Sequence, residues 1–411
     1  MDGKRLIYSL LLGNFLSFGT EGMQIELEPL NIVIGPNASG KSNLIQAIEI
    51  LRAAPTNITR PINEGGGVDE FLFKGSRETL IAALRAVINY PSKLERLIHT
   101  VSFVSSGQRF QISDEIIQGF RLAGKSGTQL IPSYYDYNGG QPLIATFFDH
   151  PEENETVNAD GWEQKLLSNI KPDQSILSQR TDPDSYPALA YLSEQYRAIK
   201  IYRGFNLDGP NSLRRAQRAD LPTDFLEEDG RNLGLMLNEL QHLGVMGTIV
   251  EKLRVVYEDV VDITVRVAEG TVQTFLHERG QHERDLRSSI PAARLSDGTL
   301  RYLCLLAILY HPTPPPLICL EEPEVGLHPD LISGLAEMLK DASQRTQLIV
   351  TTHSDLLVSS FSDMPEAVVV SERTPEGTTL KRLKADELQE WLKEYSLGEV
   401  WLKGAIGGTR W

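Results

Sequence analysis

The stretch Leu30-Asn-Ile-Val-Ile-Gly-Pro-Asn-Ala-Ser-Gly-Lys-Ser42 decides the fold, because it leads from a core strand through a glycine-bearing loop into a helix. Residues 30–34 form a short apolar run rich in β-branched side chains, which predicts a buried strand. Residues 43–51 carry apolar side chains at helical spacing. A loop in this context is typical of a P-loop, in which backbone N–H groups and the helix N-terminus converge on phosphate.

The residue types in this loop suit the binding of ATP. Gly35 and Gly40 let the backbone approach the phosphates without an intervening Cβ. Lys41 supplies positive charge to the β- and γ-phosphates, and Ser42 offers its hydroxyl to Mg²⁺. A chance match in a loop is the alternative, and the flanking strand and helix argue against it. The residues that we expect to bind ATP are Gly35, Pro36, Asn37, Ala38, Ser39, Gly40, Lys41 and Ser42.

Two adjacent glutamates, Glu321 and Glu322, follow a second apolar run at residues 317–320. A parallel core strand that ends in acids places them at the carboxyl edge of the sheet, where α/β folds bind ligands. Neighbouring side chains on a strand point to opposite sides, so the two carboxylates cannot share one task. We expect Glu321 to reach the Mg²⁺ shell and Glu322 to orient and deprotonate the attacking water. A solvated acidic turn is the alternative.

Two further segments fit the same kind of site. His353 follows the apolar run 347–352, so a strand delivers its imidazole to the same sheet edge, where it can hydrogen-bond the γ-phosphate or the water. A structural or capping histidine is the alternative. The segment Leu295-Ser-Asp-Gly-Thr299 precedes a run at 300–310 that predicts a buried helix. By itself, this segment indicates an ordinary helix N-cap.

Taken in order, the four segments resemble the ABC ATPase superfamily, whose signature motif is usually written Leu-Ser-Gly-Gly-Gln. The resemblance implies that Ser296 and the Gly298 backbone bind the γ-phosphate carried by a second subunit, so that two chains close around two ATP molecules. Asp297 and Thr299 depart from the pattern, and an acidic group near phosphate must point away or pair with a cation. The implied trans-acting residues are Ser296, Asp297, Gly298 and Thr299.

A narrower resemblance rests on Asn14-Phe-Leu-Ser-Phe18, on the Gly-Pro-Asn of the P-loop and on Glu321-Glu-Pro-Glu-Val-Gly-Leu-His-Pro329. These segments, and the closing stretch 395–411, resemble the predicted ATPases grouped with the OLD and RecF proteins in the SMC-like branch. The resemblance implies an α/β, ABC-type P-loop ATPase head: a mixed, mostly parallel sheet flanked by helices, with an antiparallel β lobe and a helical lobe. It also implies that the Glu-Pro-Glu loop faces the second subunit. The family usually has Asp at the magnesium position, where this chain has Glu321.

The long stretch between the P-loop and the signature predicts compact lobes. It lacks sustained heptads and is interrupted by prolines, which argues against the coiled coil of SMC proteins. Residues 100–112 alternate around a Gly-containing turn and predict a hairpin, 113–160 predict mostly irregular chain with short strands, and helical patterns dominate 186–257. Gln179 is a candidate link between Mg²⁺ and the helical lobe, although a surface-turn residue fits equally well. The predicted division is an ATPase core at 1–75 and 285–375, a strand-rich lobe at 76–160, a helical lobe at 161–284 and a C-terminal extension at 376–411.

Composition indicates the cellular compartment of the chain and which partners it could bind. The two cysteines, Cys304 and Cys319, lie in apolar runs and indicate core positions in a reducing compartment. We expect a cytoplasmic chain that does not enter a membrane, because no apolar run approaches the roughly 18 residues that a span needs. A net charge of −15 argues against broad nucleic-acid binding. Two arginine clusters keep such contact open, although internal ion pairs explain clusters of this kind more often: Arg203, Arg214, Arg215 and Arg218, and Arg279, Arg284, Arg287 and Arg294.

The sequence therefore predicts an enzyme that binds ATP and Mg²⁺, hydrolyses ATP slowly and dimerises around two nucleotides. The chain after His353 is too short for a Toprim nuclease domain, so we expect the output to act on a separate effector protein. The resemblance implies a role in prokaryotic antiphage defence. Two alternatives remain open at this point: a RecF-type DNA-repair clamp, and a nucleotide-gated scaffold with negligible turnover.

Overall fold

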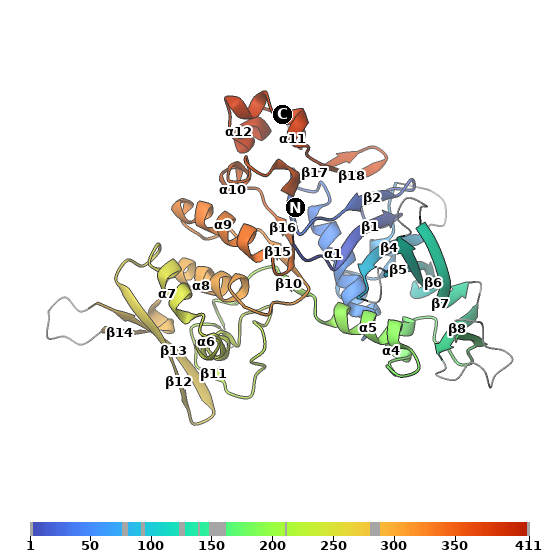
Figure 1. Cartoon of the computed structure of the whole chain (residues 1–411), viewed down its shortest axis with the longest axis horizontal. Coiled ribbons are helices and arrows are strands. Elements are labelled where there is room, and N and C mark those ends of the chain that lie inside the picture. Colours follow the sequence, from blue (N-terminus) through green and yellow to red (C-terminus); the bar gives the residue numbers. More distant parts are fainter. Residues whose placement is uncertain are drawn as a thin grey trace.

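The centre of the molecule is a six-stranded sheet in the order β10-β15-β16-β3-β17-β18 (Figure 1). The computed structural model describes residues 3–75, 81–91, 95–122, 128–138, 140–147, 162–209, 212–279 and 288–408. All neighbouring pairs in this sheet are parallel except β17 with β18. The three predicted core strands are confirmed, and they lie side by side. The bounds are β3 (Leu30–Ile34), β10 (Lys200–Tyr202), β15 (Leu317–Glu321), β16 (Gln347–Thr351), β17 (Val368–Thr374) and β18 (Gly377–Arg382).

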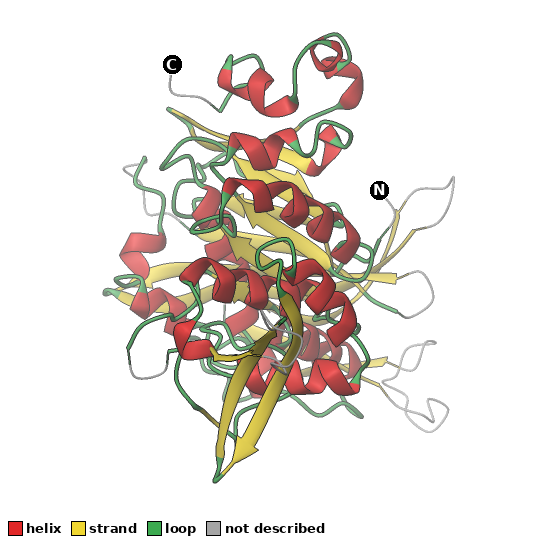
Figure 2. Ribbon diagram, turned by 90° about the vertical axis from the view of Figure 1, so that its left-hand side faces the viewer, coloured by secondary structure: helices red, strands yellow, loops and turns green. Residues whose placement is uncertain are grey.

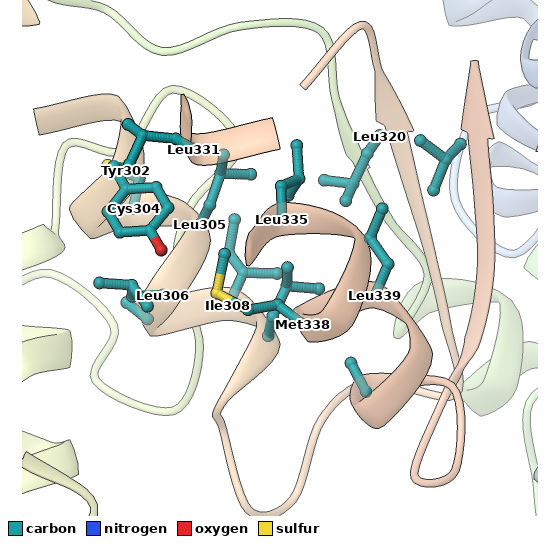
Figure 3. Close-up of a cluster of buried hydrophobic side chains, with 14 of the residues drawn as sticks. Tyr302, Cys304, Leu305, Leu306, Ile308, Leu320, Leu331, Leu335, Met338 and Leu339 are labelled. Carbon is teal, nitrogen blue, oxygen red and sulfur yellow. The ribbon is translucent and has the colours of Figure 1, made fainter. Parts of the chain in front are cut away.

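Each face of this sheet is buried in its own hydrophobic core. Alternate side chains of β3 enter different cores, Ile32 and Ile34 on one face and Val33 on the other, as the pleat of a strand requires. Helices α8 (Asp297–Leu309) and α9 (Ile332–Ala342) contribute to the first core, and α1 (Lys41–Ala53) contributes to the second. Figure 3 shows side chains of α8 and α9 packed together with Leu320 of β15. Burial of one such side chain stabilises the fold by about 1.5–3 kcal/mol.

An eight-stranded antiparallel sheet, in the order β2-β1-β4-β5-β6-β7-β8-β9, forms the strand-rich lobe (Figure 1). The hairpin predicted at 100–112 is confirmed, since β5 and β6 pair across a turn at Gly107 and Gln108, both with positive φ. The bounds are β1 (Ile7–Gly13), β2 (Met23–Glu26), β4 (Ala82–Asn89), β5 (Glu95–Ser106), β6 (Arg109–Leu122), β7 (Thr128–Asn138), β8 (Gln141–Phe147) and β9 (Trp162–Leu166).

The prediction of irregular chain at 113–160 is wrong for most of its length, because β6 and β7 are long regular strands. Irregular chain was predicted because these strands contain polar residues. Glu115 is fully buried, where its carboxylate accepts hydrogen bonds from the Ser175 hydroxyl (2.5 Å) and the Ile176 N–H (2.8 Å) and contacts His99 Nε2 (3.2 Å). A polar pattern therefore reflects buried hydrogen bonding here. Residues 148–161 lie outside the described part of the chain.

The second lobe lies on the opposite side of the central sheet (Figure 1). It holds the expected helices and also an antiparallel sheet that the sequence did not predict, whose β12–β13 hairpin projects past the helices (Figure 2). Its elements are β11 (Gln217–Arg218), α6 (Leu233–His242), α7 (Met246–Leu253), β12 (Val260–Ala268), β13 (Thr271–Glu278), β14 (Ser288–Pro291) and η3 (Ala292–Arg294). Helices α4 (Ile176–Gln179) and α5 (Pro187–Arg197) belong to the strand-rich side, where α5 packs on α1.

Short helices complete the structure and cover the end of the chain. The predicted boundary between residues 375 and 376 falls inside the β17–β18 hairpin, so the central sheet extends past it. None of the helices in the described ranges has the length and apolar character that crossing a bilayer requires. The remaining elements are α2 (Thr59–Glu64), α3 (Val68–Phe71), η4 (Pro329–Leu331), α10 (Asp355–Ser359), η5 (Pro365–Ala367), α11 (Ala385–Leu388), η6 (Trp391–Lys393) and α12 (Leu397–Leu402).

Candidate nucleotide site

The loop between β3 and α1 is held from beneath by the β17–β18 hairpin. The hydroxyls of Ser371 and Thr378 donate to the carbonyl oxygen of Ser39 over 3.0 and 2.8 Å. Gly35 and Gly40 have φ of 149° and 109°, and a Cβ at either position would lie 2.2 Å from the Ser371 carbonyl oxygen or 2.5 Å from Thr378 Oγ1. Both glycines are therefore required by the close packing of the loop on the hairpin. Sequence reasoning did not identify Ser371 or Thr378, which lie far along the chain.

The Lys41 side chain folds back over this loop. Its ammonium group donates to the carbonyl oxygens of Gly35 (2.8 Å) and Pro36 (2.9 Å). Gly40 is the N-cap of α1, so the first N–H groups of the helix open onto the same place. A loop of backbone donors, a helix N-terminus and a lysine ammonium group together suit a polyphosphate.

The two glutamates at the end of β15 face different partners. Glu321 Oε2 accepts a hydrogen bond from the Ser42 hydroxyl (3.3 Å), whereas Glu322 leaves the strand with a φ of 47° and its Oε1 lies 3.5 Å from His353 Nε2. Ser42 and Glu321 present hard oxygen donors of the kind that Mg²⁺ prefers, so this pair of residues fits the metal that a P-loop site implies. Within the described ranges, no group of three or more His, Cys, Asp or Glu side chains is arranged to hold a metal ion.

His353 is held in a setting that keeps its imidazole neutral. Burial, and then the positive charge of Lys41, lower its pKa below the ordinary value of 6.5, and the nearby Glu322 only partly opposes this shift. Its backbone N–H donates to Glu324 Oε1 (3.3 Å), which also accepts a hydrogen bond from the Thr352 hydroxyl (2.5 Å). Burial raises the pKa of the Glu324 carboxyl group.

Glu324 therefore contacts its own chain. The resemblance implied a Glu-Pro-Glu loop that faces a second subunit, and in the structure Glu324 turns inward to the segment that carries His353. Val325, the next residue, is 50% exposed and remains available on the surface.

The signature segment forms the N-terminus of α8. Ser296 is the N-cap, and its hydroxyl oxygen accepts a hydrogen bond from the Thr299 N–H (3.1 Å) and lies 2.7 Å from Thr299 Oγ1. Asp297 pairs with Arg214, whose guanidinium group also donates to the Leu295 carbonyl oxygen. Pairing with a cation is one of the two arrangements expected for an acidic group at this place, and the residue that provides it comes from the second lobe.

Arg203 is a further residue that sequence reasoning did not place in the site. The parallel register pairs Tyr202 with Leu320, so Arg203, the first residue after β10, lies beside Glu321. Its Nε donates to Glu321 Oε1 (2.7 Å) and its Nη2 to Glu49 Oε2 (2.8 Å). Burial alone would lower the pKa of Arg203, but the hydrogen bonds to both carboxylates outweigh it and raise the pKa. A cavity of about 260 Å³ opens beside this group, with Glu322 also in its wall.

The remaining predicted residues lie in local arrangements. The Gln179 amide bonds to the backbone of Lys171 and Gln174, and in the described structure none of its hydrogen bonds goes to Ser42 or Glu321. Its proposed link to Mg²⁺ gains no support from this geometry. In the first arginine cluster, Arg203, Arg214 and Arg218 form ion pairs with residues of the same chain, which weakens the case for nucleic acid. Arg284 and Arg287 lie outside the described residues.

Comparison with known proteins gives a family and a fold. The family model described as "AAA domain, putative AbiEii toxin, Type IV TA system" matches residues 30–359. The comparison with curated proteins finds no match. A solved Smc head bound to the C-winged helix domain of ScpA has a TM-score of 0.54 at 12% identity, covering 93% of this chain and 99% of that one.

A second solved Smc head has a similar fold. The Pyrococcus furiosus Smc head with an extended coiled coil, bound to the C-terminal domain of ScpA, has a TM-score of 0.54 at 11% identity and covers 95% of this chain and 99% of that one. Identities this low show the fold alone. The fold is that of an SMC head, an ABC-type ATPase fold of mixed α/β structure, as the sequence predicted.

Proposed function

Because the chain belongs to the AAA-domain family whose model spans residues 30–359, we propose that it is an SMC-like ABC ATPase that binds ATP with Mg²⁺ and hydrolyses it slowly. One observation carries this proposal. Residues following three neighbouring parallel strands, β3, β16 and β15, bring Lys41, His353 and Glu322 to one sheet edge. The carboxyl edge of a parallel sheet is where α/β folds bind ligands.

The side chains divide the work of phosphoryl transfer. Lys41 and the P-loop N–H groups bind the phosphates, and Ser42 and Glu321 would hold Mg²⁺, which when bound would supply positive charge to offset that of the phosphates. Glu322 orients the attacking water and accepts its proton, while the neutral imidazole of His353 hydrogen-bonds the γ-phosphate or that water. The contact between Glu322 and His353 keeps the two groups together at the point of attack.

We propose that the complete site forms only between two chains. Ser296 and the Gly298 backbone lie at the N-terminus of α8, where backbone donors suit an anion. In the proposed dimer they bind the γ-phosphate carried by the other chain. The difference in affinity between closed and open forms then lets ATP binding drive a change of shape.

The output of that change is proposed to act on a separate effector. The segments at 14–18, 35–37 and 321–329 resemble the group that includes the OLD and RecF proteins. The family description names an AbiEii toxin and a type IV toxin–antitoxin system, which agrees with a role in antiphage defence. Both Smc heads described above carry a domain of a separate protein, ScpA, which supports the idea that a head of this fold works with a partner.

Native mass spectrometry of tagged Glu322→Gln protein, purified from its own host with ATP and Mg²⁺, tests this function. Loss of the base is expected to trap a dimer that carries two ATP molecules, and additional mass would identify the effector. Adding Lys41→Ala to the same variant is the control, because it removes nucleotide binding while leaving the dimer surface in place. A Glu322→Gln protein that stays monomeric with ATP bound would contradict the proposal.

A further inference from the structure

A protein cation contacts Glu321, the carboxylate of the proposed metal site. Arg203 lies between two carboxylates, 2.7 Å from Glu321 and 2.8 Å from Glu49. Both acidic side chains are mostly buried, with exposed fractions of 17% and 15%, while Arg203 is 45% exposed. The three residues come from the end of β15, from α1 and from the end of β10. The guanidinium group thus joins the helix that follows the P-loop to the strand that carries Glu321.

The charge balance of this group decides what Arg203 does to a metal ion. The two carboxylates carry −2 alone and −1 with the guanidinium group between them. Arg52 also approaches Glu49 at 3.4 Å, but it pairs with Glu228 as well, so it does not replace Arg203. Coulomb attraction for a divalent ion grows with the net negative charge of its site. Arg203 therefore weakens the attraction of this site for a metal ion.

Arg203 also orients Glu321, and this second effect works in the opposite direction. With Oε1 bound to Arg203, the other oxygen, Oε2, faces the Ser42 hydroxyl. Fixing the rotamers of one glutamate side chain changes a binding constant by about thirtyfold at most. A full charge about 5 Å from a divalent ion changes it by about fifteenfold even at the dielectric constant of water, and by far more at the lower effective value near a protein surface. The charge effect is the larger of the two.

We propose that Arg203 is a built-in counter-cation of the metal site, which keeps the site from holding a divalent ion until nucleotide phosphates add their own negative charge. This inference rests on the proposed function, in which Glu321 is a metal ligand. Arg203 is a positioning residue, since it acts through Glu321. Metal and nucleotide then bind together, and the empty protein stays largely free of metal.

Mn²⁺ titration of the nucleotide-free protein, followed by electron paramagnetic resonance, tests the proposal without any turnover. Arg203→Met is expected to bind Mn²⁺ about tenfold more tightly than the wild type, and Arg203→Lys is expected to stay close to the wild type because it keeps the charge. Glu321→Gln added to Arg203→Met is expected to abolish the gain. Arg218→Met is the control, because Arg218 belongs to the same basic segment but pairs with Asp220.

The sign of the change separates this role from a structural one. A purely structural Arg203 predicts weaker Mn²⁺ binding in Arg203→Met, and either weaker or unchanged binding overturns the proposal. Arg203→Gln repeats the test with a neutral side chain that still hydrogen-bonds carboxylates, in case the methionine variant does not fold. If the gain survives Glu321→Gln, Glu321 is not the ligand, and the metal assignment in the proposed function fails as well. Nucleotide binding to the wild type tests the rest of that function independently.

Discussion

Lys41 is the single side chain on which nucleotide binding is expected to depend most. Its ammonium group donates to the carbonyl oxygens of Gly35 and Pro36, and in the proposed site it would also contact the β- and γ-phosphates. Lys41→Ala is expected to abolish measurable ATP binding in isothermal titration calorimetry, because the phosphates lose this positive charge. A folded variant that retains micromolar affinity for ATP would contradict the P-loop assignment.

His353 gives the site a predictable response to pH. Burial and the charge of Lys41 lower its pKa below 6.5, so the neutral imidazole persists to a lower pH than an ordinary histidine would allow. We expect the acid limb of the ATPase profile due to this residue to lie below pH 6.5, with kcat/KM lost as the imidazole is protonated. His353→Gln keeps a hydrogen-bonding group without titrating, and is expected to remove that limb from the profile. A limb unchanged in this variant would assign it to another group.

Single residues also show how far the sequence could predict the site. Strand alternation predicted that Glu321 and Glu322 cannot share one task. In the structure they have different partners, and Glu322 lies just past the end of β15. The place of Arg203 in the site was not predicted, because its partner Glu321 lies 118 residues away and only the register of β10 with β15 brings them together. The sequence favoured internal ion pairs for its arginine cluster, but could not identify the partners.

At the scale of elements, the N-terminus of α8 carries the proposed trans contact. Ser296→Arg is expected to leave ATP binding intact while removing ATP-driven dimerisation and hydrolysis, because a long side chain would occupy the space where the other chain's γ-phosphate is proposed to bind. Equilibrium binding of a fluorescent ATP analogue and analytical ultracentrifugation with ATP measure the two effects. Hydrolysis at the normal rate would contradict the two-chain site.

Loss of the helix cap needs its own control, since Ser296 also stabilises α8. Removing an N-cap of this kind costs about 1 kcal/mol. Ser396 caps α12 through a capping box, so Ser396→Arg removes a comparable cap from another helix. This variant is expected to dimerise with ATP as the wild type does. If it fails in the same way, lost stability explains both results.

Elements with a strong local pattern were predicted well, and those that depend on distant partners were not. The strand–loop–helix unit around the P-loop and the buried helix α8 followed from periodicity. The long strands β6 and β7 did not, because their polar side chains are satisfied by groups far away in the sequence, as Glu115 is by Ser175. The sheet inside the second lobe was not predicted for a similar reason. Its strands β12, β13 and β14 are held together by pairing with one another, and each carries only short apolar runs.

At the scale of the whole molecule, the proposed dimer builds each nucleotide site from different parts of two chains. In the proposed dimer, Lys41 and Glu322 act on the nucleotide of their own chain, whereas Ser296, at the N-terminus of α8, acts on the nucleotide of the other chain. A defect at Lys41 and a defect at Ser296 therefore damage different halves of a shared site. Two inactive chains with complementary defects can then rebuild one intact site between them.

Mixing Lys41→Ala with Ser296→Arg protein is the sharpest test of this arrangement. Each variant alone is expected to be inactive, but in a mixed dimer the P-loop of the Ser296→Arg chain meets the signature of the Lys41→Ala chain, and both are unaltered. Each mixed dimer has one intact site of two, so an equal mixture is expected to recover at most about half of the wild-type rate if the sites act independently. A chain that hydrolysed ATP without a partner would show no recovery on mixing, since each chain would still carry its own defect.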